Sequence, residues 1–403
     1  MRAMTAASFV SVAVVVLHLI DPTQAAAARS TTRWSVERAQ DWFRQQPWRK
    51  GANFLPSTAS SQLEMFQPET WDEATITREL GWAKDFGYNL VRVFLHDLLW
   101  QSEGSQFLDR VDRFLGIADA QGIGTMLVLF DGCWDPFPHL GPQLQPRPRV
   151  HNSRWVQSPG AEALTNLDKH VTRLESYVTA VIGRFANDSR VVMWDLFNEP
   201  DNANVHNYGY DGARVPVAAD AKGTELRPFE KAVGARALLE KTVAWARQLN
   251  PSQPLTVPVF TDDPTGDPAA DALKRDTYNW TLQAVDVVTF HNYNPVAGVA
   301  IDIKQLRGRV GGRPLVCSEY MARTTGSTFD PVLGFLQQHL VWAVNWGWVS
   351  GKSQTIFPWD SWNKNYPAEP KLWHHDVLRS SGKLYLAIEG AYIKNHTETF
   401  SHL

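Results

Sequence analysis

Cysteine is almost missing from this chain of 403 residues, which contains only Cys133 and Cys317. Two cysteines allow one disulfide at most, so the fold is not one of the small secreted scaffolds that disulfides hold together. Cys317 lies in an apolar run just before Glu319, where a buried free thiol is the expected state. With 44% hydrophobic residues, the chain has enough apolar side chains to build a large core of its own.

Basic runs, low-complexity segments and a strong excess of one charge are also absent. Lys and Arg together number 39 and Asp and Glu number 42, which gives a net charge of −3. Nucleic acids and anionic membrane surfaces attract proteins through clusters of basic side chains. We therefore expect neither nucleic acid nor a membrane among the partners of this protein.

Familiar cofactor and metal motifs are missing as well. No Gly-x-Gly-x-x-Gly follows the first predicted strand, which argues against a dinucleotide-binding sheet. The zinc motifs His-x-His (at that strand) and His-Glu-x-x-His are absent too. His374-His375-Asp376 could supply ligands to a metal-dependent hydrolase, which remains an alternative, but we interpret this segment as a polar turn after Trp373. The sequence therefore predicts no metal and no cofactor.

The chain also lacks an apolar run long enough to cross a bilayer, which takes about 20 residues. Its nearest candidate, Phe9–Ile20, is broken by two polar residues, follows Arg2 and precedes Pro22 and the small residues 25–28. This order is typical of a signal peptide over residues 1–28, with an uncleaved anchor as the alternative. We expect a secreted, extracellular protein; acceptor sites for N-glycosylation occur at Asn187, Asn279 and Asn395.

What the sequence does contain is a regular alternation of short apolar runs and longer amphipathic ones. The runs typical of strands are Gly51–Pro56, Asn89–Leu95, Ile123–Phe130, Arg190–Phe197, Pro254–Phe260, Val285–Phe290, Pro314–Glu319 and Trp342–Val349. Helical patterns cover Ser35–Gln46, Glu73–Phe86, Leu108–Ala120, Asp168–Phe185, Phe229–Leu249 and Pro331–Leu340. Continuous apolar strands are buried on both faces, as in parallel sheets covered by helices. Eight of them predict an α/β fold of the (β/α)8 TIM-barrel type, with residues 29–403 as one catalytic domain.

The connections between these runs are uneven in length. The helix between the fifth and sixth strands is expected to be short and interrupted by proline. Three long segments, residues 131–165, 200–228 and 350–370, follow predicted strand ends. Loops after the strands form the active-site face of such a barrel, and irregular segments of this length are usually functional.

Two of the predicted strands end in a glutamate. Glu199 stands between Asn198 and Pro200, and the proline ends the strand because it cannot donate to the ladder. Glu319 ends the seventh strand in the same way. A carboxylate at the end of a buried strand costs desolvation energy unless it has a partner. Two of them on one rim favour catalysis, because glycoside hydrolysis needs one protonated and one ionised carboxyl group.

This pattern resembles the cellulase-like glycoside hydrolase family 5, a family of retaining β-glycosidases with (β/α)8 barrels. The resemblance implies that Glu199 is the general acid/base and Glu319 the nucleophile, and that Asn198 contacts the 2-hydroxyl of the sugar. It also implies that Arg92, on the second strand, keeps the nucleophile ionised.

On the sixth strand, His291-Asn292-Tyr293 matches the His-x-Tyr of that family. The resemblance implies that His291 lines the sugar subsite and that the hydroxyl of Tyr293 reaches the nucleophile. His96-Asp97 and the loop of residues 131–135 depart from the best-known cellulases and mannanases, which leaves the substrate open.

Tryptophan is abundant, with 17 residues, and many lie near predicted strand ends or in the long loops. These are Trp100, Trp134, Trp155, Trp346, Trp348, Trp359 and Trp362. Flat indole rings pack against the C–H faces of sugars as against other apolar surfaces. The family has an aromatic after the eighth strand that supports the sugar at the cleavage point; Trp346 is the first candidate and Trp359 the second.

The sequence thus predicts a glycoside hydrolase that cleaves β-linked polysaccharides or oligosaccharides such as glucan, mannan or xylan. Alternatives are a carbohydrate-binding barrel without activity and a transglycosylase that passes the sugar to another sugar. Both keep the same groove, so only assays of activity and products separate them.

Overall fold

The computed structural model describes residues 32–202, 206–208, 228–258 and 267–396. The predicted signal peptide, residues 1–28, lies outside the described residues. Eight parallel strands form one sheet in the order β5-β4-β3-β2-β1-β8-β7-β6. The strands are β1 (Lys50–Asn53), β2 (Leu90–Phe94), β3 (Gly124–Val128), β4 (Val191–Asp195), β5 (Leu255–Thr256), β6 (Val288–His291), β7 (Leu315–Tyr320) and β8 (Trp342–Trp346). Each overlaps one of the predicted runs.

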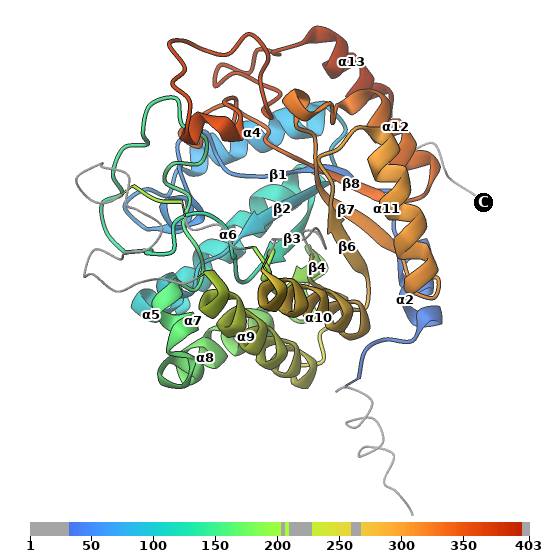
Figure 1. The fold of residues 1–403 in the computed structure, drawn as a ribbon. Helices are drawn as coiled ribbons and strands as arrows, with labels where there is room; N and C mark the ends of the chain where they lie inside the picture. Colours follow the sequence, from blue (N-terminus) through green and yellow to red (C-terminus); the bar gives the residue numbers. More distant parts are fainter. Residues whose placement is uncertain (1–31, 203–205, 209–227, 259–266, 397–403) are drawn as a thin grey trace, which may run out of the picture.

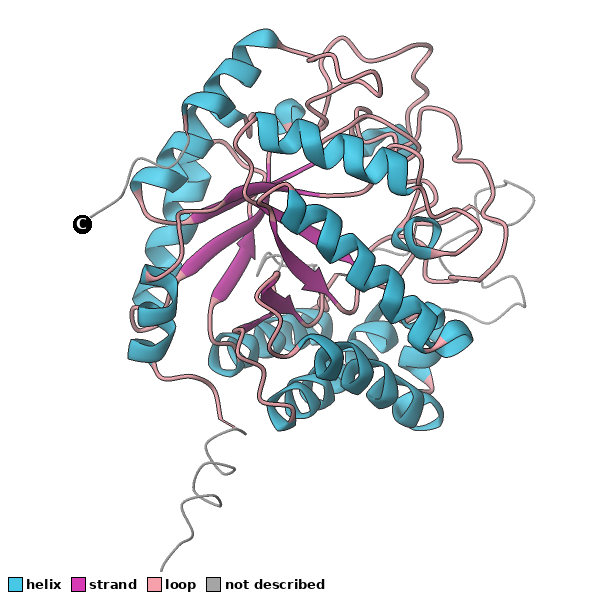
Figure 2. Ribbon diagram, turned by 180° about the vertical axis from the view of Figure 1, so that it is seen from behind, coloured by secondary structure: helices cyan, strands magenta, loops and turns pink. Residues whose placement is uncertain are grey.

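The sheet closes on itself between β5 and β6 through a few specific hydrogen bonds. The backbone amide of Asp286 donates to the carbonyl of Leu255 (2.9 Å), and the hydroxyl of Thr256 donates to the carbonyl of Val287 (2.8 Å). Helices surround the ring of strands in both views (Figures 1 and 2). The predicted (β/α)8 barrel is confirmed.

The helices of the outer layer follow the strands in sequence order. The main ones are α4 (Glu73–Asp85), α6 (Ser105–Ala120), α8 (Leu167–Phe185), α9 (Pro228–Gln248), α10 (Pro268–Ala284), α11 (Val296–Arg309) and α12 (Phe329–Gln338). Shorter or terminal ones are α2 (Val36–Arg44), α3 (Gln62–Phe66), α5 (Asp97–Glu103), α7 (Ala161–Thr165) and α13 (Ala387–Asn395), with 3₁₀ turns η1 (Arg323–Thr325) and η2 (Trp359–Trp362).

The helix between β5 and β6 corrects one expectation. The sequence suggested a short, proline-interrupted helix there, yet α10 runs for 17 residues. Pro268 occupies the first turn, where a backbone N–H would have no partner within the helix, so the proline loses no hydrogen bond there. Asp267 caps the helix by accepting from the amides of Ala269 and Ala270. The proline therefore begins this helix rather than breaking it. Helix α11 was not expected either.

The N-terminal helix closes the end of the barrel where the strands begin. Ser35 caps α2, as predicted, by accepting from the amide of Arg38. Phe43 of α2 stacks on Trp342 at a centroid distance of 4.7 Å, and Trp42 packs on the same indole at 5.6 Å. With this end filled by aromatic rings, the opposite end, where the strands finish, remains open for a site.

Two further sequence expectations concern the thiols and the membrane. Cys133 and Cys317 are both free and buried, which confirms the free thiol expected at Cys317. None of the helices within the described ranges is both long and apolar enough to span a bilayer.

Candidate active site

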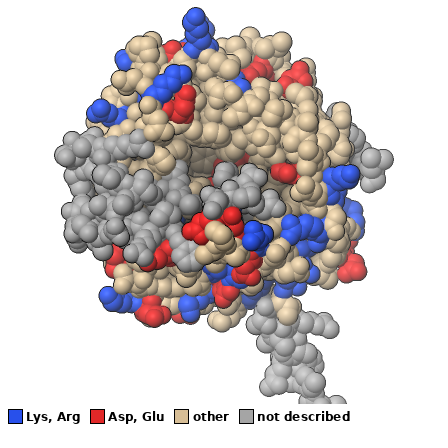
Figure 3. Space-filling model, in the orientation of Figure 1, with Lys and Arg blue, Asp and Glu red and all other residues tan. Residues whose placement is uncertain are grey.

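A pocket of about 500 Å³ lies at the carboxyl ends of the strands, a size typical of ligand sites. The face of the molecule seen in Figure 1 is hollowed near its centre in the space-filling view (Figure 3). Six of the predicted site residues line this pocket: Asn198, Glu199, Tyr293, Glu319, Trp346 and Trp359. The other two, Arg92 and His291, are buried and bonded to the two glutamates.

Glu199 sits in a constrained position directly after β4. Its backbone has a φ of +46°, a left-handed conformation that residues other than glycine rarely adopt and that clusters at functional sites. The neighbouring chain comes so close that a Cβ at Gly132 would lie 2.4 Å from the carbonyl oxygen of Glu199. Oε2 of Glu199 accepts hydrogen bonds from Asn202 (2.6 Å) and from the thiol of Cys133 (3.1 Å).

Glu319, near the end of β7, has two strong donors. Arg92 donates to its Oε1 at 2.7 Å, and the hydroxyl of Tyr293 donates to its Oε2 at 2.6 Å. Both donors stabilise the ionised carboxylate. Arg92 and Tyr293 therefore both contact Glu319, the partner that was expected for them from the sequence.

Arg92 in turn is held by groups from β1 and from β4 and its end. Its guanidinium donates to Asn53 on β1 (2.8 Å), to Asp195 on β4 (2.9 and 2.7 Å) and to Asn198 after β4 (2.6 Å). The arginine is fully buried, so these partners offset its desolvation and fix the direction in which it faces Glu319.

The two glutamates face one another across the pocket. A carboxylate oxygen of Glu199 and one of Glu319 lie within 4.8 Å of each other. The ring of His291 bridges them, with Nδ1 2.5 Å from Oε1 of Glu199 and Nε2 3.5 Å from Oε1 of Glu319. Carboxyl groups about 5–5.5 Å apart are typical of retaining glycosidases, whereas inverting enzymes need about 6.5–9.5 Å.

Burial shapes the protonation of this pair. It raises the pKa of both Glu199 and Glu319, and it lowers the pKa of His291 to about 3, so the imidazole is neutral. Two carboxylates this close cannot easily both be ionised. Arg92 and Tyr293 stabilise the charged form of Glu319, so we assign the shared proton to Glu199.

Several members of this network were not identified from the sequence. Asp131, after β3, accepts from the amide of Asn198 (2.9 Å) and from the indole of Trp155 (2.5 Å), and burial raises its pKa to about 6. The sequence marks Cys133 as a possible disulfide partner and as part of the loop 131–135, expected to form a subsite wall, and Cys133 does line the pocket. The sequence does carry one signal that could have revealed Asp195, which is the single charged residue in the otherwise apolar stretch 191–197.

Six of the seven tryptophans proposed as sugar platforms separate into two groups, and the seventh, Trp155, is buried and bonded to Asp131. Trp134, Trp346, Trp359 and Trp362 line the large pocket. Trp134 and Trp362 are stacked at 5.5 Å. Trp100 and Trp348 do not line it: the indole of Trp100 donates to Ser176, and that of Trp348 donates to the carbonyl of Glu79 within the core. Position near a strand end was thus insufficient to identify a platform.

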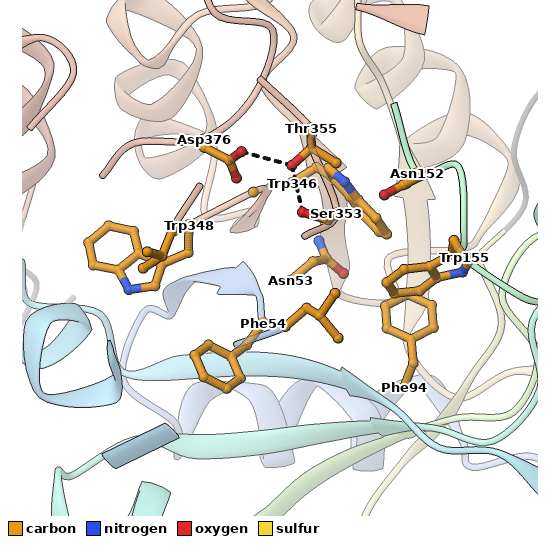
Figure 4. Close-up of a pocket in the computed structure, with 13 residues that line it drawn as sticks. Asn53, Phe54, Phe94, Asn152, Trp155, Trp346, Trp348, Ser353, Thr355 and Asp376 are labelled. Atoms are coloured by element: carbon orange, nitrogen blue, oxygen red, sulfur yellow. Dashed lines mark hydrogen bonds between the residues drawn. The ribbon is translucent and has the colours of Figure 1, made fainter. Parts of the chain in front are cut away.

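A small cavity beside Trp346 extends the site (Figure 4). Asn152 belongs to the walls of both this cavity and the large pocket. Its side chain is buried, yet neither its amide nitrogen nor its amide oxygen has a hydrogen-bond partner within the described structure. An unpaired buried amide costs about 1–3 kcal/mol, which a hydroxyl-rich ligand in the pocket would recover.

The segment after Trp373 differs from its interpretation as a polar turn. His374 and His375 do form a bend, but they and Asp376 are all buried. His375 lines the large pocket and lies 5.6 Å from the ring of Tyr293.

Comparisons with known proteins agree with this architecture. A family model described as cellulase, glycosyl hydrolase family 5, matches residues 57–352. A solved structure of a GH5_18 protein from Streptomyces cattleya in complex with GlcNAc is 12% identical with a TM-score of 0.55, over 87% of this chain and 79% of that one. A GH5_18 protein from Bifidobacterium longum subsp. infantis is 14% identical with a TM-score of 0.52, over 87% and 78%.

An exo-β-1,4-mannosidase from Opitutaceae bacterium strain TAV5 is 15% identical with a TM-score of 0.51, over 86% of this chain and 58% of that one. At such low identities these likenesses support the fold alone. No curated protein matches the sequence.

Proposed function

Because this chain belongs to glycosyl hydrolase family 5, we propose that it hydrolyses β-linked oligosaccharides or polysaccharides with retention of configuration. The observation that carries the proposal is the pair of buried carboxyl groups, Glu199 and Glu319, whose oxygens lie within 4.8 Å across one pocket. This spacing supports a retaining mechanism, because the carboxyl groups of inverting enzymes stand about 6.5–9.5 Å apart.

In the first step, Glu319 attacks the anomeric carbon while Glu199 gives its proton to the departing glycosidic oxygen. A covalent glycosyl-enzyme forms and the aglycone leaves as an alcohol. In the second step, the now ionised Glu199 takes a proton from water, whose oxygen attacks the anomeric carbon and releases Glu319. The hydrogen bonds from Arg92 and Tyr293 keep Glu319 ionised between cycles.

The substrate class is best searched for among β-mannosides first. Structures of similar fold include an exo-β-1,4-mannosidase and a GH5_18 protein in complex with Manβ1-4GlcNAc, at TM-scores of 0.51 and 0.52. The test is a panel of β-mannan, glucan, xylan and aryl glycosides, with the first-formed anomer identified by NMR. We expect a β-anomer from a β-linked substrate; an α-anomer, or no hydrolysis of any member of the panel, would refute the proposal.

Tyr293→Phe is expected to move the acidic limb of the pH profile of kcat/KM upward by about one unit. The variant removes a hydrogen bond to the ionised form of Glu319, which raises the pKa of that carboxyl. One unit corresponds to about 1.4 kcal/mol, the scale of a charge-assisted hydrogen bond. Activity needs Glu319 ionised, so it is lost at a higher pH than in the wild type as the pH falls.

The matched control for this measurement is Tyr177→Phe. It also removes one buried tyrosine hydrogen bond, to the carbonyl of Leu129, but away from the pocket. An unchanged acidic limb in Tyr293→Phe, or the same shift in both variants, would contradict the role of Tyr293.

Asn152→Gly is expected to raise KM about tenfold while leaving thermal stability undiminished. The unpaired amide of Asn152 finds partners only when a sugar fills the pocket, so its loss weakens binding by about 1.4 kcal/mol. Glycine tolerates the φ of +48° at this position. Asn250→Gly is the control, because Asn250 has a similar φ of +46° and is exposed; a fall in melting temperature without a change in KM would show that Asn152 is purely structural.

We also propose that the protein is exported. The support comes from the sequence of residues 1–28 and from the three acceptor asparagines, Asn187, Asn279 and Asn395, which are all exposed. Sequencing the N-terminus of the protein recovered from culture medium tests the predicted cleavage.

A further inference from the structure

Three histidines form a compact buried cluster beside the pocket. His151 comes from the long loop after β3, and His374 and His375 come from the segment after β8. Their ring centroids are 4.1, 5.3 and 5.7 Å apart. One ring nitrogen from each lies within 4.8 Å of the corresponding nitrogens of the other two. All three side chains are at most 1% exposed.

The Nδ1 atoms of these rings are already engaged. Nδ1 of His151 lies 2.8 Å from the carbonyl of Phe357, and Nδ1 of His375 lies 2.6 Å from the carbonyl of Met321. A carbonyl only accepts, so both rings must carry their proton on Nδ1, which leaves the lone pair on Nε2. This is the usual state of a metal-binding histidine, whose second nitrogen donates to a backbone carbonyl or carboxylate.

His374 adds an unpaired atom to the cluster. Its Nδ1 lies 2.6 Å from the hydroxyl of Thr324, while its Nε2 is buried with no hydrogen-bond partner within the described structure. An imidazole binds a metal in its neutral form, through the ring nitrogen that carries no proton.

We propose that His151, His374 and His375 form a site for a divalent transition-metal ion of the zinc type, next to the sugar-binding pocket. Three neutral nitrogen donors suit Zn²⁺ and its neighbours, and Ca²⁺ and Mg²⁺ prefer oxygen. Binding at about 2.1 Å would bring the three nitrogens, which now lie within 4.8 Å of one another, to about 3.4 Å from one another.

The position of this site defines what the ion would do. His151 and His375 line the large pocket, so the remaining coordination position is open to water or to a sugar hydroxyl. The ion would also tie the loop after β3 to the segment after β8, which form adjoining walls of the pocket. The nearby guanidinium of Arg323 is paired with Glu389 (2.8 and 2.6 Å), so its charge is largely compensated. The ion is not needed for bond cleavage, which the two glutamates perform.

The test measures zinc retained by the full chain, without substrate. After EDTA treatment and removal of the chelator, the wild type is incubated with Zn²⁺, passed through gel filtration and analysed by elemental mass spectrometry. We expect one zinc per chain in the wild type and a loss of at least tenfold in His374→Asn, whose amide can still bond Thr324 but lacks Nε2. His339→Asn is the control, because His339 bonds a carbonyl through Nδ1, as His151 and His375 do, but lies at the end of α12.

A second variant separates this site from the catalytic one. Glu199, His291 and Glu319 also present three potential ligand atoms within 4.8 Å, so Glu199→Gln is included and is expected to retain its zinc. Loss of zinc in Glu199→Gln but not in His374→Asn would overturn the proposal, and so would a wild type that retains none.

Cobalt provides a readout that needs no variant. Co²⁺ bound by three imidazoles and water gives intense visible absorption, in contrast to the weak bands of the octahedral aqua ion. We expect the intense bands in the wild type together with a higher melting temperature on Zn²⁺ addition. Weak octahedral bands alone would refute the site even if His374→Asn failed to fold. None of these results depends on glycoside hydrolysis, so they stand or fall separately from the proposed function.

Discussion

Glu319→Gln is expected to lower kcat/KM for a β-glycoside by about four to six orders of magnitude, as removal of a covalent nucleophile does in other enzymes. The amide cannot attack the anomeric carbon, so no glycosyl-enzyme forms. The fold is expected to survive, because Arg92 keeps its bonds to Asp195, Asn53 and Asn198 and is not left as an unpaired buried charge. Circular dichroism and a melting curve check the fold beside the kinetics.

Azide adds a stereochemical test of the same residue. In Glu319→Ala, azide can occupy the space of the missing carboxylate and attack the anomeric carbon from that side. A β-linked aryl glycoside should then yield the α-glycosyl azide, with the aglycone as leaving group. Glu79→Gln is the control for loss of a buried carboxyl, because Glu79 accepts bonds from Ser57 and lies outside the pocket. Near-normal turnover in Glu319→Gln would contradict its assignment as the nucleophile.

Glu199→Ala is expected to show an effect that depends on the leaving group. Without the acid, substrates with poorly acidic alcohols as leaving groups should lose about 10²–10⁴-fold in kcat/KM, the usual contribution of general acid–base catalysis. Substrates with an acidic phenol as leaving group need little protonation, so their first step should be nearly normal and the glycosyl-enzyme should accumulate as a burst.

Azide distinguishes the two glutamates in this variant too. It should attack the accumulated glycosyl-enzyme from the side of residue 199 and give the β-glycosyl azide, opposite to the product from Glu319→Ala. The basic limb of the pH profile should also disappear, because in the wild type activity is lost when Glu199 deprotonates as the pH rises through its elevated pKa. An equal loss for all leaving groups would count against Glu199 as the acid.

The architecture was largely predictable because it depends on local patterns. Strands buried on both faces need continuous apolar runs, and each of the eight observed strands overlaps such a run. The error at α10 had a local cause: the prolines of this segment suggested an interrupted helix, whereas Pro268 follows the cap Asp267 and stands in the first turn. Helix boundaries depend on capping geometry that apolar periodicity does not show.

The candidate site was predictable in part, because some of its residues are also marked by local patterns. Glu199 and Glu319 were identified because proline and strand ends place them on one rim of a barrel. Asn53, which accepts from Arg92, the thiol of Cys133 and the amide of Asn152 carry no local sign of their role, whereas Asp195 is marked only by its place in an apolar run. The position of Trp348 after a strand end wrongly suggested a sugar platform, since its side chain packs in the core.

The sequence alone was enough to predict the barrel, the family and the two candidate catalytic glutamates, because residues close together in the chain determine apolar periodicity and strand ends. Tertiary structure alone decided that the two glutamates face each other across a gap of less than 5 Å, and that His151 meets His374 and His375 from more than 200 positions away. Contacts of this kind depend on how closed strands and long loops converge in space, and no spacing along a chain specifies that convergence.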